Sequence, residues 1–147
     1  MGIYNHTGQV VTDLDRSRRF YEEVLGFRFW FEFNPPDEAT AKLSSLKAPL
    51  GATAWYLTLD GFVLELIRYS EPGVTAAYRP RTMNEPGLTH LSFAVDDVWA
   101  TAKKAVEFGG QIIEESDIGI GLFIRDPDGQ LLELLHPSFR ANLPPKP

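Results

Sequence analysis

The segment Asp128-Gly129-Gln130-Leu131-Leu132-Glu133-Leu134-Leu135 is a second version of an earlier one, Asp60-Gly61-Phe62-Val63-Leu64-Glu65-Leu66-Ile67, in the same register. A second pair of related segments precedes these two. His6-Thr7-Gly8-Gln9-Val10-Val11 is followed by Asp13-Leu14, and His90-Leu91-Ser92-Phe93-Ala94-Val95 is followed by Asp97-Val98. The chain is therefore predicted to consist of two repeats, each with one histidine and one glutamate at corresponding positions.

Working outward from these segments, each repeat is predicted to contain a strand, a helix and three further strands. Asp13 suits a helix N-cap and Gly26 a helix end, and the aromatic alternation over 27–33 is typical of a strand. The dipeptide Asp60-Gly61 predicts a hairpin, and Asp126-Pro127-Asp128-Gly129 predicts a type I turn. The expected strands are 3–11, 27–33, 52–59, 62–69, 88–95, 111–115, 120–125 and 131–135, and the expected helices are 14–25 and 98–108.

The domain prediction is one domain over residues 1–137, made of repeats at about 3–69 and 88–137 with a linker over 70–87. The first repeat is longer because it carries an irregular segment from Asn34 to Leu50, with a helical turn expected around Glu38 to Leu46. Residues 138–147 contain Pro144, Pro145 and Pro147 and are expected to form an extended tail, since proline cannot donate to a sheet.

Composition excludes several classes of function. The chain has 147 residues and a net charge of −6, without the basic cluster that nucleic acid binding requires. It contains no cysteine, which excludes disulfides and thiolate ligands. No signal peptide is evident, and no apolar run reaches the roughly 18 residues of a membrane span. We therefore expect a cytoplasmic protein that binds neither membrane nor nucleic acid.

The four repeated residues suggest a metal site. Side chains alternate across a strand, so each glutamate is expected on the partly apolar face opposite the helix, where a carboxylate needs a cation or strong donors. Two imidazoles and two carboxylates are suitable ligands for a divalent metal. The predicted metal ligands are His6, Glu65, His90 and Glu133. His136 falls on the opposite face and is interpreted as a residue at a strand end.

Three motifs, which together cover about Tyr4 to Pro137, carry a family resemblance. The motifs are His6 to Asp13-Leu14 with Phe20-Tyr21 and Val24-Leu25-Gly26-Phe27, Gly87 to Val95-Asp96-Asp97, and Arg125-Asp126-Pro127-Asp128-Gly129 with Leu132-Glu133-Leu134. They resemble the vicinal oxygen chelate superfamily, which includes glyoxalase I, methylmalonyl-CoA epimerase, extradiol dioxygenases and bleomycin-resistance proteins. The resemblance implies an α+β fold of two tandem βαβββ modules that form a curled mixed sheet with helices outside. It also implies a homodimer.

The ligand set looks like that of a bacterial glyoxalase I. That resemblance implies one divalent ion per site (Ni, Co, Zn, Mn or Fe) and a lyase, isomerase or epimerase reaction on a small carbonyl substrate through a metal-bound enediolate. Glu133 is then the first choice for the catalytic base and Glu65 the second. The sequence leaves open whether a site lies within one chain or is shared across a dimer.

Other functions remain open. Thr7-Gly8-Gln9-Val10 lacks the arginine with which glyoxalase I holds glutathione, and methylmalonyl-CoA epimerase usually has glutamine where this chain has Glu65. An extradiol-type Fe(II) dioxygenase would use His6, His90 and Glu133. A metal-free binding protein of the bleomycin-resistance kind usually lacks these residues, whereas all four are present here. In a further alternative, both histidines are simply hydrogen-bonded core residues. Arg68, Arg79 and Arg81 are either anion-binding residues or ordinary surface and linker arginines.

Overall fold

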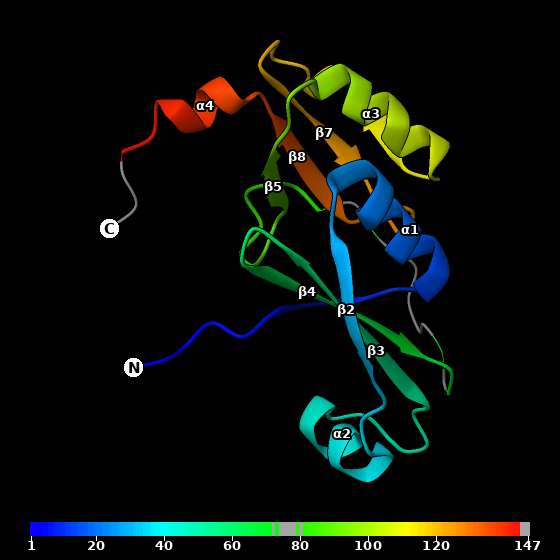
Figure 1. Cartoon of the computed structure of the whole chain (residues 1–147). Helices are drawn as coiled ribbons and strands as arrows, with labels where there is room; N and C mark the ends of the chain where they lie inside the picture. The colour runs from blue at the N-terminus through cyan, green and yellow to red at the C-terminus, as the bar shows by residue number, and fades with distance from the viewer. Residues whose placement is uncertain (72, 74–78, 80, 145–147) are drawn as a thin grey trace. The chain divides into compact units, whose positions relative to one another are not determined.

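The computed structural model describes residues 1–71, 73, 79 and 81–144 (Figure 1). The chain divides into two compact units, one formed by Met1–Glu22 with Gly26–Ala77 and the other by Glu23–Leu25 with Tyr78–Pro147. Each unit contains a four-stranded mixed sheet.

The two sheets have the same topology. In the first, β1 is parallel to β4 and the order is β1-β4-β3-β2; in the second, β5 is parallel to β8 and the order is β5-β8-β7-β6. The predicted α+β fold of two βαβββ modules is confirmed. The elements are β1 (Thr7–Val10), α1 (Leu14–Leu25), β2 (Arg28–Phe33), α2 (Asp37–Ser44), β3 (Ala52–Leu59), β4 (Phe62–Tyr69), β5 (Leu91–Ala94), α3 (Val98–Glu107), β6 (Gln111–Ile113), η1 (Glu114–Ser116), β7 (Gly121–Arg125), β8 (Leu131–Leu135) and α4 (Pro137–Ala141).

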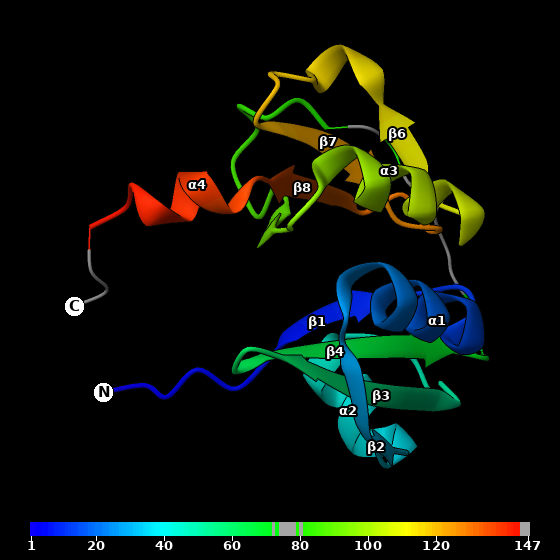
Figure 2. The same ribbon diagram turned by 45° about the horizontal axis from the view of Figure 1, so that its top comes forward.

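One face of each sheet is buried. In β3 and β4, Leu57, Leu64 and Leu66 are fully buried, and they alternate with the half-buried Tyr56 and Glu65. In the second unit α3 lies against β6, β7 and β8 (Figure 2), and the buried Leu132 and Leu134 of β8 alternate with Glu133. Both glutamates therefore lie on the face opposite the buried leucines, as the alternation predicted.

The helix caps and turns that the local sequence predicts are present in the structure. Asp13 accepts a hydrogen bond from the amide of Arg16, and α1 ends at Gly26 with a φ of 79°. At the β3–β4 hairpin, Asp60 and Gly61 both have positive φ, 48° and 77°, as a two-residue type I′ turn requires. The amide of Gly129 donates to the carbonyl of Asp126, which closes the turn before β8.

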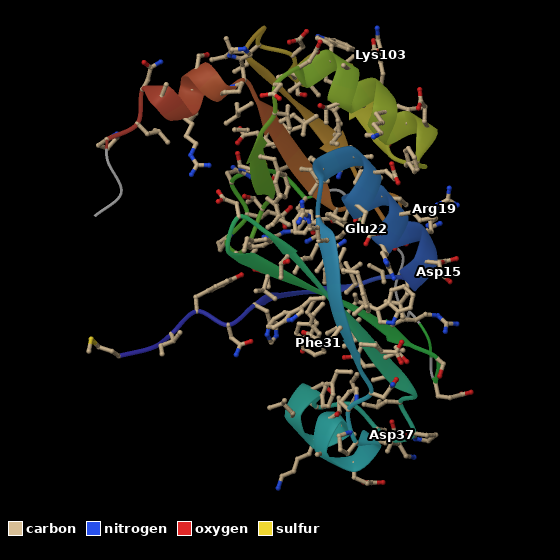
Figure 3. All side chains as sticks on the ribbon, in the orientation of Figure 1. Asp15, Arg19, Glu22, Phe31, Asp37 and Lys103 are labelled. Carbon is tan, nitrogen blue, oxygen red and sulfur yellow. The ribbon has the colours of Figure 1, made fainter. Side chains whose placement is uncertain are left out.

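The segment unique to the first repeat folds as α2. The carboxylate of Asp37, labelled in Figure 3, accepts hydrogen bonds from the amides of Leu50 and Gly51. Ala41 packs with Leu50 and Ala52 in a small buried cluster. These contacts tie the segment to the start of β3, so it is ordered structure rather than the mostly irregular loop that the sequence suggested.

Three predictions of local structure need correction. The tail does not continue as an extended arm directly after β8, because Pro137 occupies the first turn of a short helix, α4, which His136 caps. The strand expected over 111–115 stops at Ile113, and Glu114–Ser116 forms a 3₁₀ turn instead. The first strand of each repeat begins later than predicted, at Thr7 and at Leu91. The remainder of the tail and linker predictions that fall on 72, 74–78, 80 and 145–147 lie outside the described residues.

None of the helices in the described part of the chain is long and apolar enough to cross a membrane.

Candidate metal centre

The parallel strand pair of each unit brings a histidine beside a glutamate. His6 and His90 each lie directly before the first strand of their unit, not within it. The register pairs Gly8 with Glu65 and Ser92 with Glu133. Each histidine precedes its Gly8 or Ser92 by two residues, which places imidazole and carboxylate on the same side of the sheet.

In the first unit, His6 Nε2 lies 3.0 Å from Glu65 Oε2. The other ring nitrogen, Nδ1, is 2.7 Å from Asn5 Oδ1, a partner that orients the ring and leaves Nε2 on the glutamate side. The side chains of His6 and Glu65 are 34% and 12% exposed. This pair is thus accessible at the imidazole and largely enclosed at the carboxylate.

Tyr56 holds the other oxygen of this carboxylate. Its hydroxyl donates to Glu65 Oε1 at 2.5 Å, across the β3–β4 pair. Burial, followed by this hydrogen bond and the charge of Glu65, raises the pKa of Tyr56 to about 12. The phenol ring stacks on Phe31, labelled in Figure 3, with centroids 4.4 Å apart and planes at 6°, and meets the His6 ring edge-on at 5.6 Å.

The second unit contains a similar but looser pair. His90 Nε2 lies 3.6 Å from Glu133 Oε2, and His90 Nδ1 is 2.9 Å from Thr89 Oγ1. The hydroxyl of Ser92 donates to the same Oε2 of Glu133 at 2.6 Å. Phe123 meets the His90 ring edge-on, with centroids 5.3 Å apart.

Tyr56 and Ser92 are the site residues that sequence reasoning did not assign. A signal for Tyr56 was available, because a two-residue hairpin at Asp60-Gly61 pairs Leu59 with Phe62 and hence Tyr56 with Glu65. Strand alternation puts Ser92 on the same face as His90, but the bond from Ser92 to Glu133 can be identified only from the parallel register of β5 and β8.

Each unit brings together one imidazole and one carboxylate, two side chains of metal-ligand type. Among the described residues, no third histidine, aspartate or glutamate joins either pair to make a group of metal-ligand type. An imidazole nitrogen and a carboxylate oxygen, with the second imidazole nitrogen already oriented, are donors that fit a divalent transition metal.

The other candidate residues have structural partners. His136 Nδ1 accepts from the amide of Ser138 and so caps α4. Arg79 pairs with the carboxylate of Glu85. Arg81 donates to backbone carbonyls, among them that of Leu88. The linker interpretation therefore accounts for Arg79 and Arg81, and Arg68 lies on β4 opposite Thr53.

A hollow beside the first pair is suited to a small molecule. Its volume is about 520 Å³, within the usual range of ligand sites, and none of the described residues that line it is charged. Tyr56 lines this hollow and also donates a hydrogen bond to Glu65. Asn5 lines it too and is hydrogen-bonded to His6. The described residues that line the hollow are Tyr4, Asn5, Trp30, Phe31, Phe33, Tyr56 and Val63.

The chain is similar to several known proteins over most of its length. The chain is 29% identical to the lactoylglutathione lyase of Pseudomonas putida, over 92% of this chain and 86% of that protein. It is also 29% identical to the lactoylglutathione lyase of Haemophilus influenzae, over 88% and 89%. The trypanothione-dependent glyoxalase I of Leishmania major has a similar structure, with a TM-score of 0.66, 26% identity and coverage of 92% and 87%. A glyoxalase family protein from Bacillus cereus shares the fold, with a TM-score of 0.76, 20% identity and coverage of 90% and 92%. Residues 3–134 match the Glyoxalase/Bleomycin resistance protein/Dioxygenase superfamily, and the chain belongs to that family.

Proposed function

We propose that this protein is a divalent-metal-dependent, glyoxalase-like lyase or isomerase that acts on a small carbonyl compound by proton abstraction. The observation that carries the proposal is the matched pair of His–Glu contacts, one at the same register position of each repeat. The resemblance to lactoylglutathione lyases over most of both chains supports the lyase class.

In this proposal His6, Glu65, His90 and Glu133 are the protein ligands of one divalent ion per site, either within one chain or across a homodimer. When bound, such an ion polarises a substrate carbonyl and makes the adjacent C–H more acidic. Ni, Co, Zn, Mn and Fe all suit two imidazoles and two carboxylates. Asn5 and Thr89 orient the two imidazoles through their Nδ1 atoms.

A glutamate of the set serves as the base. Glu133 is the first choice and Glu65 the second, because the final glutamate has this role in the enzymes that the chain resembles. The carboxylate takes the proton from the carbon next to the carbonyl and returns it to the neighbouring carbon, so that no external oxidant or reductant is needed. The uncharged hollow at Tyr56 suits an apolar part of the substrate.

The deciding experiment is metal analysis of tag-free protein purified without chelator. We expect about one ion per site in the parent protein and loss of the ion in His90→Ala. His136→Ala is the matched control, because His136 caps α4 and belongs to neither pair. Absence of metal in the parent, even after reconstitution with each candidate ion, would contradict the proposal.

The reaction is tested on the same samples. The hemithioacetal of glutathione and methylglyoxal is the first substrate to examine, with formation of S-lactoylglutathione as the readout. We expect Glu133→Gln to lose turnover more than 100-fold, as for removal of a positioned general base. Bound iron together with oxygen consumption on a catechol would instead favour the dioxygenase alternative.

A further inference from the structure

The two glutamates are held in different ways. Glu65 uses both carboxylate oxygens, since Oε1 accepts from Tyr56 and Oε2 lies against His6. In Glu133 the contacts with His90 and Ser92 both fall on Oε2. Within the described part of the chain, Glu133 has no further bond to Oε1. Two chemically identical pairs therefore differ in how firmly the carboxylate is oriented.

The difference arises at corresponding positions of the two sheets. The antiparallel partner of Glu65 is Tyr56, and that of Glu133 is Phe123. Both rings meet their histidine edge-on, at 5.6 Å and 5.3 Å. An aromatic ring is thus used in both units to pack the imidazole, but only in the first does it carry a hydroxyl. The packing role alone does not require that hydroxyl.

Several features make Tyr56 a rigid donor. Its ring lies parallel to Phe31 at 4.4 Å, and its residue is paired on both sides within the sheet. A hydroxyl-to-carboxylate bond of 2.5 Å is at the short, strong end of the range for such bonds. A carboxylate bound in this way has little freedom to rotate.

We propose that Tyr56 is a positioning residue that fixes the carboxylate of Glu65, so that Glu65 remains a constant ligand while Glu133, the base of the proposed function, stays able to turn. This inference rests on the proposed metal-dependent function. Tyr56 is then a further residue of the site, and its hydroxyl is the physical reason why the two repeated pairs have different roles.

The first test is the metal affinity of Tyr56→Phe, measured by competition calorimetry with Zn²⁺ or Ni²⁺. We expect affinity to fall about 10-fold or more, the usual effect of removing a group that orients a ligand. The matched control is Tyr21→Phe. It also removes a tyrosine hydroxyl, one that bonds Gln9 at 2.9 Å in the same unit, and it should leave metal affinity unchanged.

A rescue separates positioning from a merely structural role. Gly8 faces Glu65 as Ser92 faces Glu133, and a Cβ added at Gly8 would lie 3.3 Å from Glu65 Oε2. Adding Gly8→Ser to Tyr56→Phe therefore copies the arrangement of the second unit, in which the carboxylate is held less firmly, and we expect it to restore only part of the lost affinity. Gly8→Ala in the same background supplies the Cβ without the hydroxyl and should restore none of it.

The role of Glu133 is tested by Phe123→Tyr. This substitution offers Glu133 Oε1 a tyrosine hydroxyl like the one that Tyr56 donates to Glu65 Oε1. Metal affinity should be kept while kcat on the hemithioacetal falls and KM stays unchanged. An unchanged kcat would overturn the division of roles.

The outcomes distinguish the two proposals. If the parent protein binds metal and Tyr56→Phe binds it equally well, the inference about Tyr56 is wrong while the proposed function stands. If the parent binds no metal, the proposed function fails, and the inference that rests on it fails too. The positioning contact itself is still checked in metal-free protein, where Tyr56→Phe should shift the ¹⁵N resonances of His6 and leave those of His90 unchanged.

Discussion

At the scale of single residues, Asp126 supports the strand that carries Glu133. It is 3% exposed, and its Oδ1 accepts from the amides of Asp128 and Gln130. Asp126→Ala leaves these donors without their acceptor, so we expect it to lower the free energy of unfolding by about 2 kcal/mol. Asp126→Asn keeps an acceptor and should cost less. Urea denaturation measures both, and equal losses would contradict this account.

Gly121 is needed because the backbone comes close to it. A Cβ at this position would lie 2.8 Å from the carbonyl oxygen of Leu134 and 2.5 Å from a methyl of Leu135. The carbonyl belongs to the β7–β8 ladder and cannot move away freely, so Gly121→Ala should destabilise the protein by roughly 1–3 kcal/mol. Gly2→Ala, where no atom lies within 4 Å of the added Cβ, is the control. Thermal unfolding compares the two.

The site residues differ in how far they could be predicted from sequence. The repeat identifies His6, Glu65, His90 and Glu133 by position, because alternation along β4 and β8 places each glutamate opposite the buried leucines. Which donor contacts which carboxylate oxygen depends on the strand register and on the side-chain rotamers, and the sequence pattern alone specifies neither. Whether the four residues together bind a metal stays a prediction.

At the scale of elements, the helices α1 and α3 begin in the same way. The carboxylate of Asp13 accepts from the amide of Arg16, and that of Asp97 accepts from the amide of Ala100. We expect Asp13→Ala and Asp97→Ala each to cost about 1 kcal/mol, while the asparagine variants, which still cap, cost less. Chemical denaturation provides the comparison. Equal stability of the alanine and asparagine variants would show that the caps contribute nothing.

The loop that leads into β5 is held by charged contacts. Glu85 accepts from Arg79 at 2.9 Å and from the amide of Thr82 at 3.1 Å, and these contacts lower its pKa from 4.5 to about 2. A lowered carboxyl pKa means that the contacts are complete above pH 4.5 and are lost as pH falls toward about 2. The amide resonance of Thr82 should therefore titrate with a midpoint near 2, and Glu85→Gln should abolish that transition. A midpoint near 4.5 would contradict the ion pair.

Elements with strong local signals were predicted well. The helix from Leu14 and the strands of the β3–β4 hairpin have the predicted bounds, since a cap, a C-terminal glycine and a tight turn define their ends. The structure differs from the prediction where contacts between distant residues determine whether an element forms or where it ends. Helix α2 depends on Asp37 reaching the amides of Leu50 and Gly51, far along the chain. Strand β6 ends early because the hydroxyl of Ser116 bonds the carbonyl of Ile113 and the amide of Phe123.

At the scale of the whole molecule, the two repeats share one fold but differ in the residues around their histidine and glutamate. The two sheets share one strand order, and each places its histidine and glutamate alike. Helix α2, Tyr56 and the aromatic hollow belong to the first unit. Duplication therefore explains why the histidines and glutamates occur in pairs, and divergence of the residues around them gives the two pairs different surroundings.

If one ion takes ligands from both repeats, the repeats must be linked thermodynamically. At a metal concentration 100 times Kd, binding should stabilise the parent protein by about 2.7 kcal/mol. His6→Ala and His90→Ala should each abolish most of that gain, and the double variant should lose little more, because the ligands act as one set. His136→Ala should respond to metal as the parent does. Calorimetric unfolding with and without Zn²⁺ measures all four variants. Retention of the gain in either single variant would mean that one repeat binds the ion alone. Refolding His6→Ala and His90→Ala chains together then distinguishes a site within one chain from a site shared across a dimer. Metal binding returns only in the shared case, where each chain supplies the pair that the other has lost.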